Sequence, residues 1–393
     1  MIPIRSVTIT ALASAVLATT LTGCQFGAAE QDTSPIVIAV DLELSGSAAP
    51  AGKAYQRALE LKRDQLNASG ALGARKIELK VKDNRSDASE SLRNVNDFSN
   101  DSQVSALIMG GCNECAVGAV RTINEKKLPT VALAPTSAVA SPVADRRYVF
   151  KLAPNAVDSA AALTGELRRR GIRKVAVLNS EDSYGREGLA ALRSELVKAD
   201  IRLVSDQGIK ATETEVGQPV RTLAERDPQA LIVWTPPEQA MLAASAAQQA
   251  KFKGSLFFDA AAAGDLFLGA STRSTERATL IFTQTMVIDD VIATTPAKAA
   301  RRQWFQDYTA RFGGYNGFSS FAADAVQLIA DAELRAGGQP GKPGRDGLRD
   351  VLETSQLDGL SGPIRMTPDN HSGLMPQALT TLVARGGRWR LAG

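Results

Sequence analysis

The chain has 393 residues, of which 44% are hydrophobic and 22% are charged. This is a globular composition, with enough length for two ordinary domains. The formal net charge of +3 is too small to indicate a nucleic-acid partner or an acidic substrate.

The N-terminus has the pattern of a secretory signal peptide. Arg5 precedes an apolar stretch that ends at Leu21, and Ser and Thr residues interrupt this stretch too often for a permanent membrane span. Leu21-Thr22-Gly23-Cys24 resembles the lipobox of bacterial lipoproteins, which implies lipidation of Cys24. The alternative is an ordinary signal peptide with an incidental cysteine. We expect residues 1–23 to be a lipoprotein signal peptide and residues 24–35 to be a polar tether to the membrane.

Residues 36–67 predict a strand, a loop of small residues and a helix. Ile36–Val40 is apolar and rich in β-branched residues, which is typical of a strand buried on both faces. The following loop contains Ser45 between small residues, and apolar residues then recur at helical spacing. Small ligands of open α/β sheets bind at the carboxyl ends of strands, beside helix N-termini. The segment therefore predicts half of a ligand pocket, with Ser45 in it.

Strand and helix patterns alternate along the rest of the chain. Strands are expected at Lys76–Val81, Val104–Met109, Thr130–Leu133, Lys174–Leu178, Ile201–Ser205, Ala230–Trp234, Ser255–Phe258, Thr279–Phe282, Gly362–Met366 and Ala378–Val383. Helices are expected at Ala88–Phe98, Ala116–Glu125, Ser159–Arg169, Gly188–Lys198, Val216–Arg226, Ala297–Phe312 and Phe321–Arg335. The Gly- and Pro-rich stretch Gly337–Gly347 predicts a surface loop. This alternation favours an α/β fold with parallel sheets built from βαβ units.

Short motifs, in order along nearly the whole mature chain, resemble those of the type I periplasmic binding proteins. The branch that they resemble contains the branched-chain amino acid (Leu/Ile/Val) substrate-binding proteins of ABC transporters. The motifs are Leu44-Ser45-Gly46 with Gly52, Asn67-Ala68-Ser69-Gly70, Lys82-Asp83-Asn84, Tyr148-Val149-Phe150-Lys151, Asp182-Ser183-Tyr184-Gly185-Arg186-Glu187-Gly188, Asp324-Ala325-Val326 and Leu360-Ser361-Gly362-Pro363-Ile364. Each motif is weak by itself, but the ordered set is strong.

The resemblance implies two Rossmann-like lobes with parallel sheets, joined by three crossover hinges, that close over a ligand held between them. The crossovers are expected near residues 151–155, 283–286 and 357–362. Lobe I is expected to comprise residues 36–152 and 286–357. Lobe II is expected to comprise residues 153–285 and 358–393.

In lobe I, the resemblance implies ligand contacts from two loops. Thr136 and Ser137 are the expected contacts of a ligand carboxylate or ammonium; the alternative is turn and helix N-cap duty. The other loop departs from the family, because it offers Asn113 and Glu114. A glutamate there repels a carboxylate unless it points away. A cationic, amide-like or polyol ligand is therefore an alternative to an amino acid.

In lobe II, the resemblance implies contacts from Tyr184, Trp234 and Asp259. Tyr184 matches the tyrosine that lies over the ligand, although a partly exposed turn is also compatible with the sequence. Trp234 ends a predicted strand and fits either a ligand contact or the core. Asp259 falls near the acidic partner of a ligand ammonium, or serves as a helix N-cap.

Cys112 and Cys115 form a Cys-x-x-Cys motif that has three interpretations. A zinc site lacks ligands, because His371 is the only histidine of the chain. Thioredoxin-like chemistry needs the pair at a helix N-terminus, whereas outside the cytoplasm a structural disulfide is favoured. His371 lies in a polar turn and is expected to be exposed to solvent. We expect no metal site, no cofactor and no catalytic residues.

The sequence thus predicts an extracytoplasmic, lipid-anchored solute-binding protein. It would capture a small polar solute, an amino acid or an amide-like compound, and deliver it to the permease and ATPase subunits of an ABC importer. The alternative is a ligand-sensing lipoprotein on the same fold that signals to a membrane receptor or kinase. A secreted enzyme is a third interpretation, and it would depend on His371 or on the cysteines.

Overall fold

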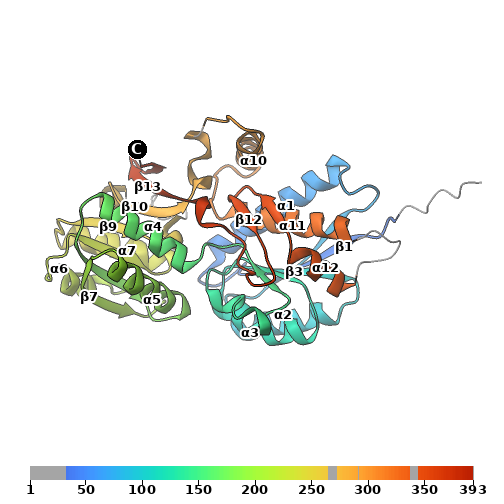
Figure 1. The fold of residues 1–393 in the computed structure, drawn as a ribbon, viewed down its shortest axis with the longest axis horizontal. Helices are drawn as coiled ribbons and strands as arrows, with labels where there is room; N and C mark the ends of the chain where they lie inside the picture. Colours follow the sequence, from blue (N-terminus) through green and yellow to red (C-terminus); the bar gives the residue numbers. More distant parts are fainter. Residues whose placement is uncertain (1–31, 264–271, 291, 337–343, 393) are drawn as a thin grey trace, which may run out of the picture. The chain divides into compact units, whose positions relative to one another are not determined.

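The computed structural model describes residues 32–263, 272–290, 292–336 and 344–392, which belong to one compact unit (Figure 1). The expected signal peptide, most of the tether and Cys24 lie outside the described residues. No helix in the described ranges is long and apolar enough to cross a membrane.

The first sheet has five parallel strands in the order β2-β1-β3-β4-β5. These strands are β1 (Ile36–Leu42), β2 (Ile77–Asp83), β3 (Val104–Met109), β4 (Thr130–Ala132) and β5 (Val149–Lys151). All residues of β1 are buried, because Ile36, Ile38 and Val40 enter one apolar cluster and Val37 and Ala39 enter another on the opposite face. This alternation is the expected one for a central strand with both faces covered.

Helices cover both faces of the first sheet. They are α1 (Ala49–Ser69), α2 (Ala88–Asn100), α3 (Asn113–Glu125), α11 (Ser319–Ala336) and α12 (Arg345–Leu352), while α10 (Pro296–Phe312) packs against α1. In Figure 1, α1 and α11 lie side by side on one face, and α2 and α3 lie on the other. The chain therefore returns to the first lobe after completing much of the second.

The second sheet has seven strands in the order β14-β13-β10-β9-β8-β6-β7. The strands are β6 (Lys174–Ser180), β7 (Arg202–Ile209), β8 (Ala230–Trp234), β9 (Ser255–Phe258), β10 (Thr279–Thr283), β13 (Leu379–Arg385) and β14 (Arg388–Leu391). Strands β6 to β10 are parallel, whereas β13 and β14 form an antiparallel hairpin on the edge at β10. The hairpin turns at Gly386 and Gly387, with φ of 57° and 74°, a conformation that suits glycine.

Four helices of ordinary length flank the second sheet. They are α4 (Ala156–Arg169), α5 (Ser183–Lys198), α6 (Gly217–Ala224) and α7 (Pro237–Gln249), and a single turn, α9 (Thr272–Thr275), precedes β10. The chain leaves the first sheet after β5 and comes back after β10 through the short helix η4 (Gln284–Asp290). It crosses last through the small hairpin β11 (Gln356–Asp358) and β12 (Pro363–Arg365). The predicted two-lobed α/β fold is confirmed.

Two of the sequence motifs are joined by hydrogen bonds at the last crossover. The Asp324 carboxylate on α11 accepts hydrogen bonds from the backbone N–H groups of Leu360 and Ser361 at 2.7 and 2.8 Å and from the Ser361 hydroxyl at 2.5 Å. Asp83 fixes the first loop in the same way, since it accepts from Leu44 N–H at 2.9 Å and from the Ser45 hydroxyl at 2.6 Å. Both motifs therefore hold loops in place.

Three predictions about helices were wrong. Helix α7 was not predicted, because its alanine-rich sequence has little amphipathic contrast. Helix α12 begins at Arg345, inside the loop expected at Gly337–Gly347, of which residues 337–343 lie outside the described part. Helix α3 begins at Asn113 rather than at Ala116, because the Cys112 sulfur accepts the Cys115 N–H at 3.1 Å and caps the helix.

Candidate functional site

Three polar side chains lie in a row at the carboxyl edge of the second sheet. Asn179, the second-last residue of β6, pairs with Trp234 of β8, and Asp259 directly follows Phe258 of β9, which pairs with Val233. Residues in register on neighbouring strands point to the same face of a sheet. The three side chains are only 4%, 1% and 1% exposed. Asn179 Oδ1, Trp234 Nε1 and Asp259 Oδ1 nevertheless have no hydrogen-bond partner among the described residues.

The environment of Asp259 differs from that of Asp41, a buried aspartate near the end of β1 in the first sheet. Asp41 accepts hydrogen bonds from Asn84 Nδ2 at 3.0 Å, Ser91 Oγ at 2.5 Å and Asn94 Nδ2 at 2.8 Å. The Asp259 carboxylate accepts a single hydrogen bond from another described residue, the Ala261 N–H at 3.4 Å, which is a weak cap of the next turn. Burial raises the pKa of Asp259 well above 3.8, and the nearby Asp182 carboxylate adds to the effect.

Helix α5 fixes the position of Trp234. Gly188 lies against the indole, and the Tyr184 ring is tilted against it, with centroids 6.2 Å apart. Tyr184 is 8% exposed and belongs to the first turn of α5, so the expected alternative of a partly exposed turn tyrosine was wrong. Trp234 belongs to the same apolar cluster, but its N–H group is left free to donate to a ligand.

In the first lobe, Asn113, Thr136 and Ser137 lie close together. The Thr136 N–H donates to Asn113 Oδ1 at 3.0 Å. Thr136 Oγ1 accepts the Ala138 N–H at 3.4 Å and thereby caps the short helix η1 (Ser137–Val139). Thr136 therefore has the capping role of the alternative interpretation, and its hydroxyl proton remains available for another partner.

Two carboxylates bridge the lobes at this point. The Glu187 carboxylate of α5 accepts a hydrogen bond from the Thr136 hydroxyl at 2.7 Å. It also accepts the Ser137 N–H, which lies 2.9 Å from Oε2 and 3.1 Å from Oε1. Glu114 of α3 accepts the Ser183 hydroxyl of α5 at 2.8 Å. Ser183 and Glu187 are four residues apart and share one face of α5. Glu114 thus points toward the second lobe.

A third carboxylate, that of Glu43, occupies the start of helix α3. It is buried and accepts the Cys112 N–H at 2.7 Å and the Gly111 N–H at 3.3 Å. Burial raises the pKa of Glu43, and these two N–H groups act against the increase. Gly110 leaves room for the carboxylate, since a Cβ atom there would lie 2.3 Å from Glu43 Oε2.

The remaining predicted residues of the first lobe have structural partners. Ser45 is exposed and bound to Asp83, as described above. Cys112 and Cys115 are joined by a disulfide at the start of α3, with their Cα atoms 5.2 Å apart. No group of three or more metal-binding side chains occurs in the ranges that the structure describes.

His371 was expected to be exposed, and this was wrong. It is 0% exposed and stacks on Phe150 with ring centroids 4.4 Å apart, while Nδ1 lies 3.0 Å from the Val149 carbonyl oxygen. Burial lowers its pKa below 6.5. The neighbouring Lys151 is also buried, and its ammonium donates to the carbonyls of Ala153 and Pro154 at 2.7 and 3.2 Å. These residues line the first crossover and not the row at Asp259.

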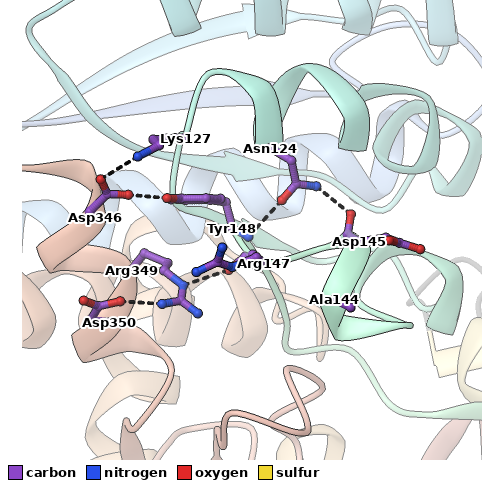
Figure 2. Close-up of a pocket in the computed structure, with 9 residues that line it drawn as sticks. All are labelled: Asn124, Lys127, Ala144, Asp145, Arg147, Tyr148, Asp346, Arg349 and Asp350. Carbon is purple, nitrogen blue, oxygen red and sulfur yellow. Dashed lines mark hydrogen bonds and ion pairs between the residues drawn. The ribbon is translucent and has the colours of Figure 1, made fainter.

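A surface pocket of about 450 Å³ lies elsewhere, at the C-terminal end of α3 (Figure 2). It is lined by Asn124, Lys127, Ala144, Asp145, Arg147, Tyr148, Asp346, Arg349 and Asp350. Its charges largely satisfy one another, because Lys127 pairs with Asp346 at 2.9 Å and Arg349 pairs with Asp350. The row at Asp259 contains buried polar atoms without hydrogen-bond partners among the described residues, so we take that row and the neighbouring loops as the candidate site.

The sequence did not predict Asn179, Glu187 or Glu43 as parts of this site. Asn179 was missed because the strand was expected to end at Leu178. Glu187 was missed because the helix was expected to begin at Gly188. The signal for the earlier start was Asp182, whose carboxylate caps α5 by accepting the Gly185 N–H at 2.9 Å.

Residues 35–387 match the family of periplasmic binding proteins, and the chain belongs to this family. No curated protein matches the chain in sequence. Members of the family bind small molecules outside the cytoplasm.

Solved structures share the fold. An extracellular ligand-binding receptor from Rhodopseudomonas palustris HaA2 is 23% identical, with a TM-score of 0.83 over 91% of this chain and 99% of that one. A leucine-binding protein from Thermotoga maritima MSB8 is 17% identical, with a TM-score of 0.79 over 91% and 98% of the two chains. A solute-binding protein of an ABC transporter from R. palustris, in complex with benzoate, is 16% identical, with a TM-score of 0.78 over 91% and 96%. At these identities the likeness defines the fold.

Proposed function

We propose that this protein is the lipid-anchored solute receptor of an ABC importer and that it binds a small polar solute bearing an amine. The observation that carries the proposal is the row of Asn179, Trp234 and Asp259, in which buried polar atoms lack partners within the described chain. Leaving such groups unpaired costs free energy, and a ligand that pairs them recovers it. The role in import is supported by the family and by the ABC-transporter proteins of the same fold.

The row suits a solute with hydrogen-bond donors and at least one acceptor. Asp259 Oδ1 and Asn179 Oδ1 accept from an ammonium or amide N–H, and Trp234 Nε1 donates to a carbonyl or hydroxyl oxygen. Asn113, Thr136 and Ser137 border the site from the first lobe, where Thr136 and Ser137 are bound to Glu187, and Glu114 borders it from α3. In this proposal Cys24 carries the lipid anchor, and the lobes have the boundaries that the sequence predicts.

The test is a thermal-shift screen of the mature protein against amino acids, amides, amines, sugars and nucleosides. A ligand at 100 times its dissociation constant stabilises the fold by about 2.7 kcal/mol. Asp259→Asn should abolish the shift produced by the best ligand. Glu181→Gln removes an exposed carboxylate beside the site and is the matched control. An equal ligand-induced shift in the Asp259→Asn variant would contradict the proposed site.

The anchor has a separate test. The Cys24→Ala variant should lose membrane association and metabolic labelling with a fatty acid, whereas the Cys112→Ala and Cys115→Ala double variant should keep both. Labelling that survives in Cys24→Ala would contradict the lipidation.

A further inference from the structure

The donors that the first lobe offers to a ligand carboxylate are already occupied by a carboxylate of this chain. Glu187 takes both the Thr136 hydroxyl and the Ser137 N–H. This pair of donors, a hydroxyl and a backbone N–H, is well suited to a carboxylate, and hydrogen bonds to an ionised acceptor are among the stronger ones in proteins. A ligand carboxylate would have to displace Glu187 and then lie beside it.

The other carboxyl groups around the site increase the free-energy cost of placing a ligand carboxylate there. Glu43 accepts hydrogen bonds from the N–H groups of Gly111 and Cys112, and Glu114 accepts one from the Ser183 hydroxyl. On the second lobe, Asp182 caps α5 and acts electrostatically on Asp259. A second negative charge close to several carboxylates is strongly disfavoured, because the effective dielectric constant of a protein interior is well below that of water.

Cations near the site do not offset these charges. Lys151 is near enough to interact with Glu187, but its ammonium is buried and bound to the carbonyls of Ala153 and Pro154. Arg186 is exposed and donates to the Glu181 carbonyl. Asp259 Oδ1, which has no partner among the described residues, is the independent indication that a ligand binds here. As an acceptor, it suits a ligand that carries a hydrogen-bond donor.

We propose that Glu187 is a specificity-determining residue, which stands in for a ligand carboxylate at Thr136 and Ser137 and restricts the site to amines and amides without a carboxylate. This inference rests on the proposed function and names the substrate class of the same site. The Glu187 bridge, defined as the contact of Glu187 with Thr136 and Ser137, also holds the two lobes together before a ligand binds.

Two sets of matched compounds test the substrate class by calorimetry on the full mature chain. The first set is leucine, leucinamide and 3-methylbutylamine; the second is lysine, lysinamide and cadaverine. In the set whose side chain fits, the amine or amide should bind at least tenfold more tightly than the amino acid. Glu187→Gln should reduce this preference at least threefold, because it removes the competing charge, and Glu181→Gln should leave it unchanged.

An amino acid that binds the wild-type protein as tightly as its amide would overturn the inference and leave the proposed function intact. A preference that is identical in wild type and Glu187→Gln would also overturn it.

A double-mutant cycle in the free protein tests the Glu187 bridge without any ligand. Thr136→Val and Glu187→Gln should each lower the melting temperature, and the double variant should lose clearly less than the sum. Additive losses would overturn the bridge, whatever the ligand screen gives. If no compound of any class binds but the cycle shows coupling, the bridge stands and the proposed function fails.

Discussion

Gly188 of α5 lies directly against the indole of Trp234, such that a Cβ atom at position 188 would approach Trp234 Nε1 to 2.3 Å. The helix and the tryptophan are therefore packed together without room for a methyl group. The absence of a side chain at position 188 fixes where the free N–H of Trp234 lies.

Gly188→Ala should destabilise the protein by about 1–3 kcal/mol, because the indole or the helix must shift. Chemical denaturation measures the change. Gly165→Ala is the matched control, since Gly165 is exposed within α4 and a Cβ atom there meets nothing within 4 Å. That control should gain about 0.5–1 kcal/mol from the lower backbone entropy of alanine. Equal effects at the two positions would contradict the packing argument.

Asp259→Asn should raise the melting temperature of the free protein at neutral pH while it abolishes binding. The pKa of Asp259 is raised by burial, so between the unfolded pKa and the raised folded pKa the folded chain binds more protons than the unfolded chain. The contribution of Asp259 to stability therefore falls as the pH rises from its unfolded pKa through its raised folded pKa. The gain from the substitution should accordingly shrink on acidification toward pH 4.

Asp41→Asn should change stability in the opposite direction, toward a less stable fold, and serves as the comparison. The Asp41 carboxylate accepts three side-chain hydrogen bonds, and an amide at this position cannot accept all of them. We expect a loss of about 1–3 kcal/mol by chemical denaturation. If both asparagine variants shift stability in the same direction, the difference drawn between the two aspartates is wrong.

Lys151 should make stability increase with pH above neutrality. Burial lowers its pKa from 10.5 to about 7, against the opposing effects of Glu187 and Asp158. Between about pH 7 and pH 10.5 the unfolded chain thus binds more protons than the folded one, and the folded state gains stability as the pH rises. Melting curves from pH 7 to pH 9.5 should show this slope in wild type and a smaller one in Lys151→Met. Lys53→Met, which changes an exposed lysine, should retain the wild-type slope.

The Cys112–Cys115 disulfide should contribute modestly to stability. It closes a loop of only four residues, for which the chain-entropy estimate is about 2 kcal/mol. The double substitution Cys112→Ser and Cys115→Ser should lose about this amount by denaturation, and serine preserves an N-cap at position 112. Treatment of the wild type with a reductant should produce the same loss. A serine variant as stable as the oxidised protein would show that the bond contributes nothing.

The strands were predictable because they are short apolar runs, and Val104–Met109, Ala230–Trp234 and Ser255–Phe258 were predicted with their observed bounds. The burial of His371 was not, because it depends on stacking with Phe150, a residue more than 200 positions away in the sequence. Local polarity around His371 indicates a turn and carries no information about what covers it.

The same limit applies to the candidate site. The resemblance pointed to the ends of strands and the loops that follow them, and the row at Asp259 lies at such strand ends. Which of their polar atoms remain unpaired depends on contacts across the molecule. Thr136 illustrates this, because the sequence allowed either a ligand contact or an N-cap role and did not indicate that its hydroxyl donates to Glu187 of α5.

The order in which the chain visits its two sheets also has a consequence for biosynthesis. Helix α11, which covers the face of β1, emerges from the ribosome only after β6 to β10, and the second sheet is completed by β13 and β14 at the very end. The core of the first half therefore stays incomplete until α11 has been made, and that of the second until β13 and β14 have been made, although many proteins fold unit by unit during synthesis.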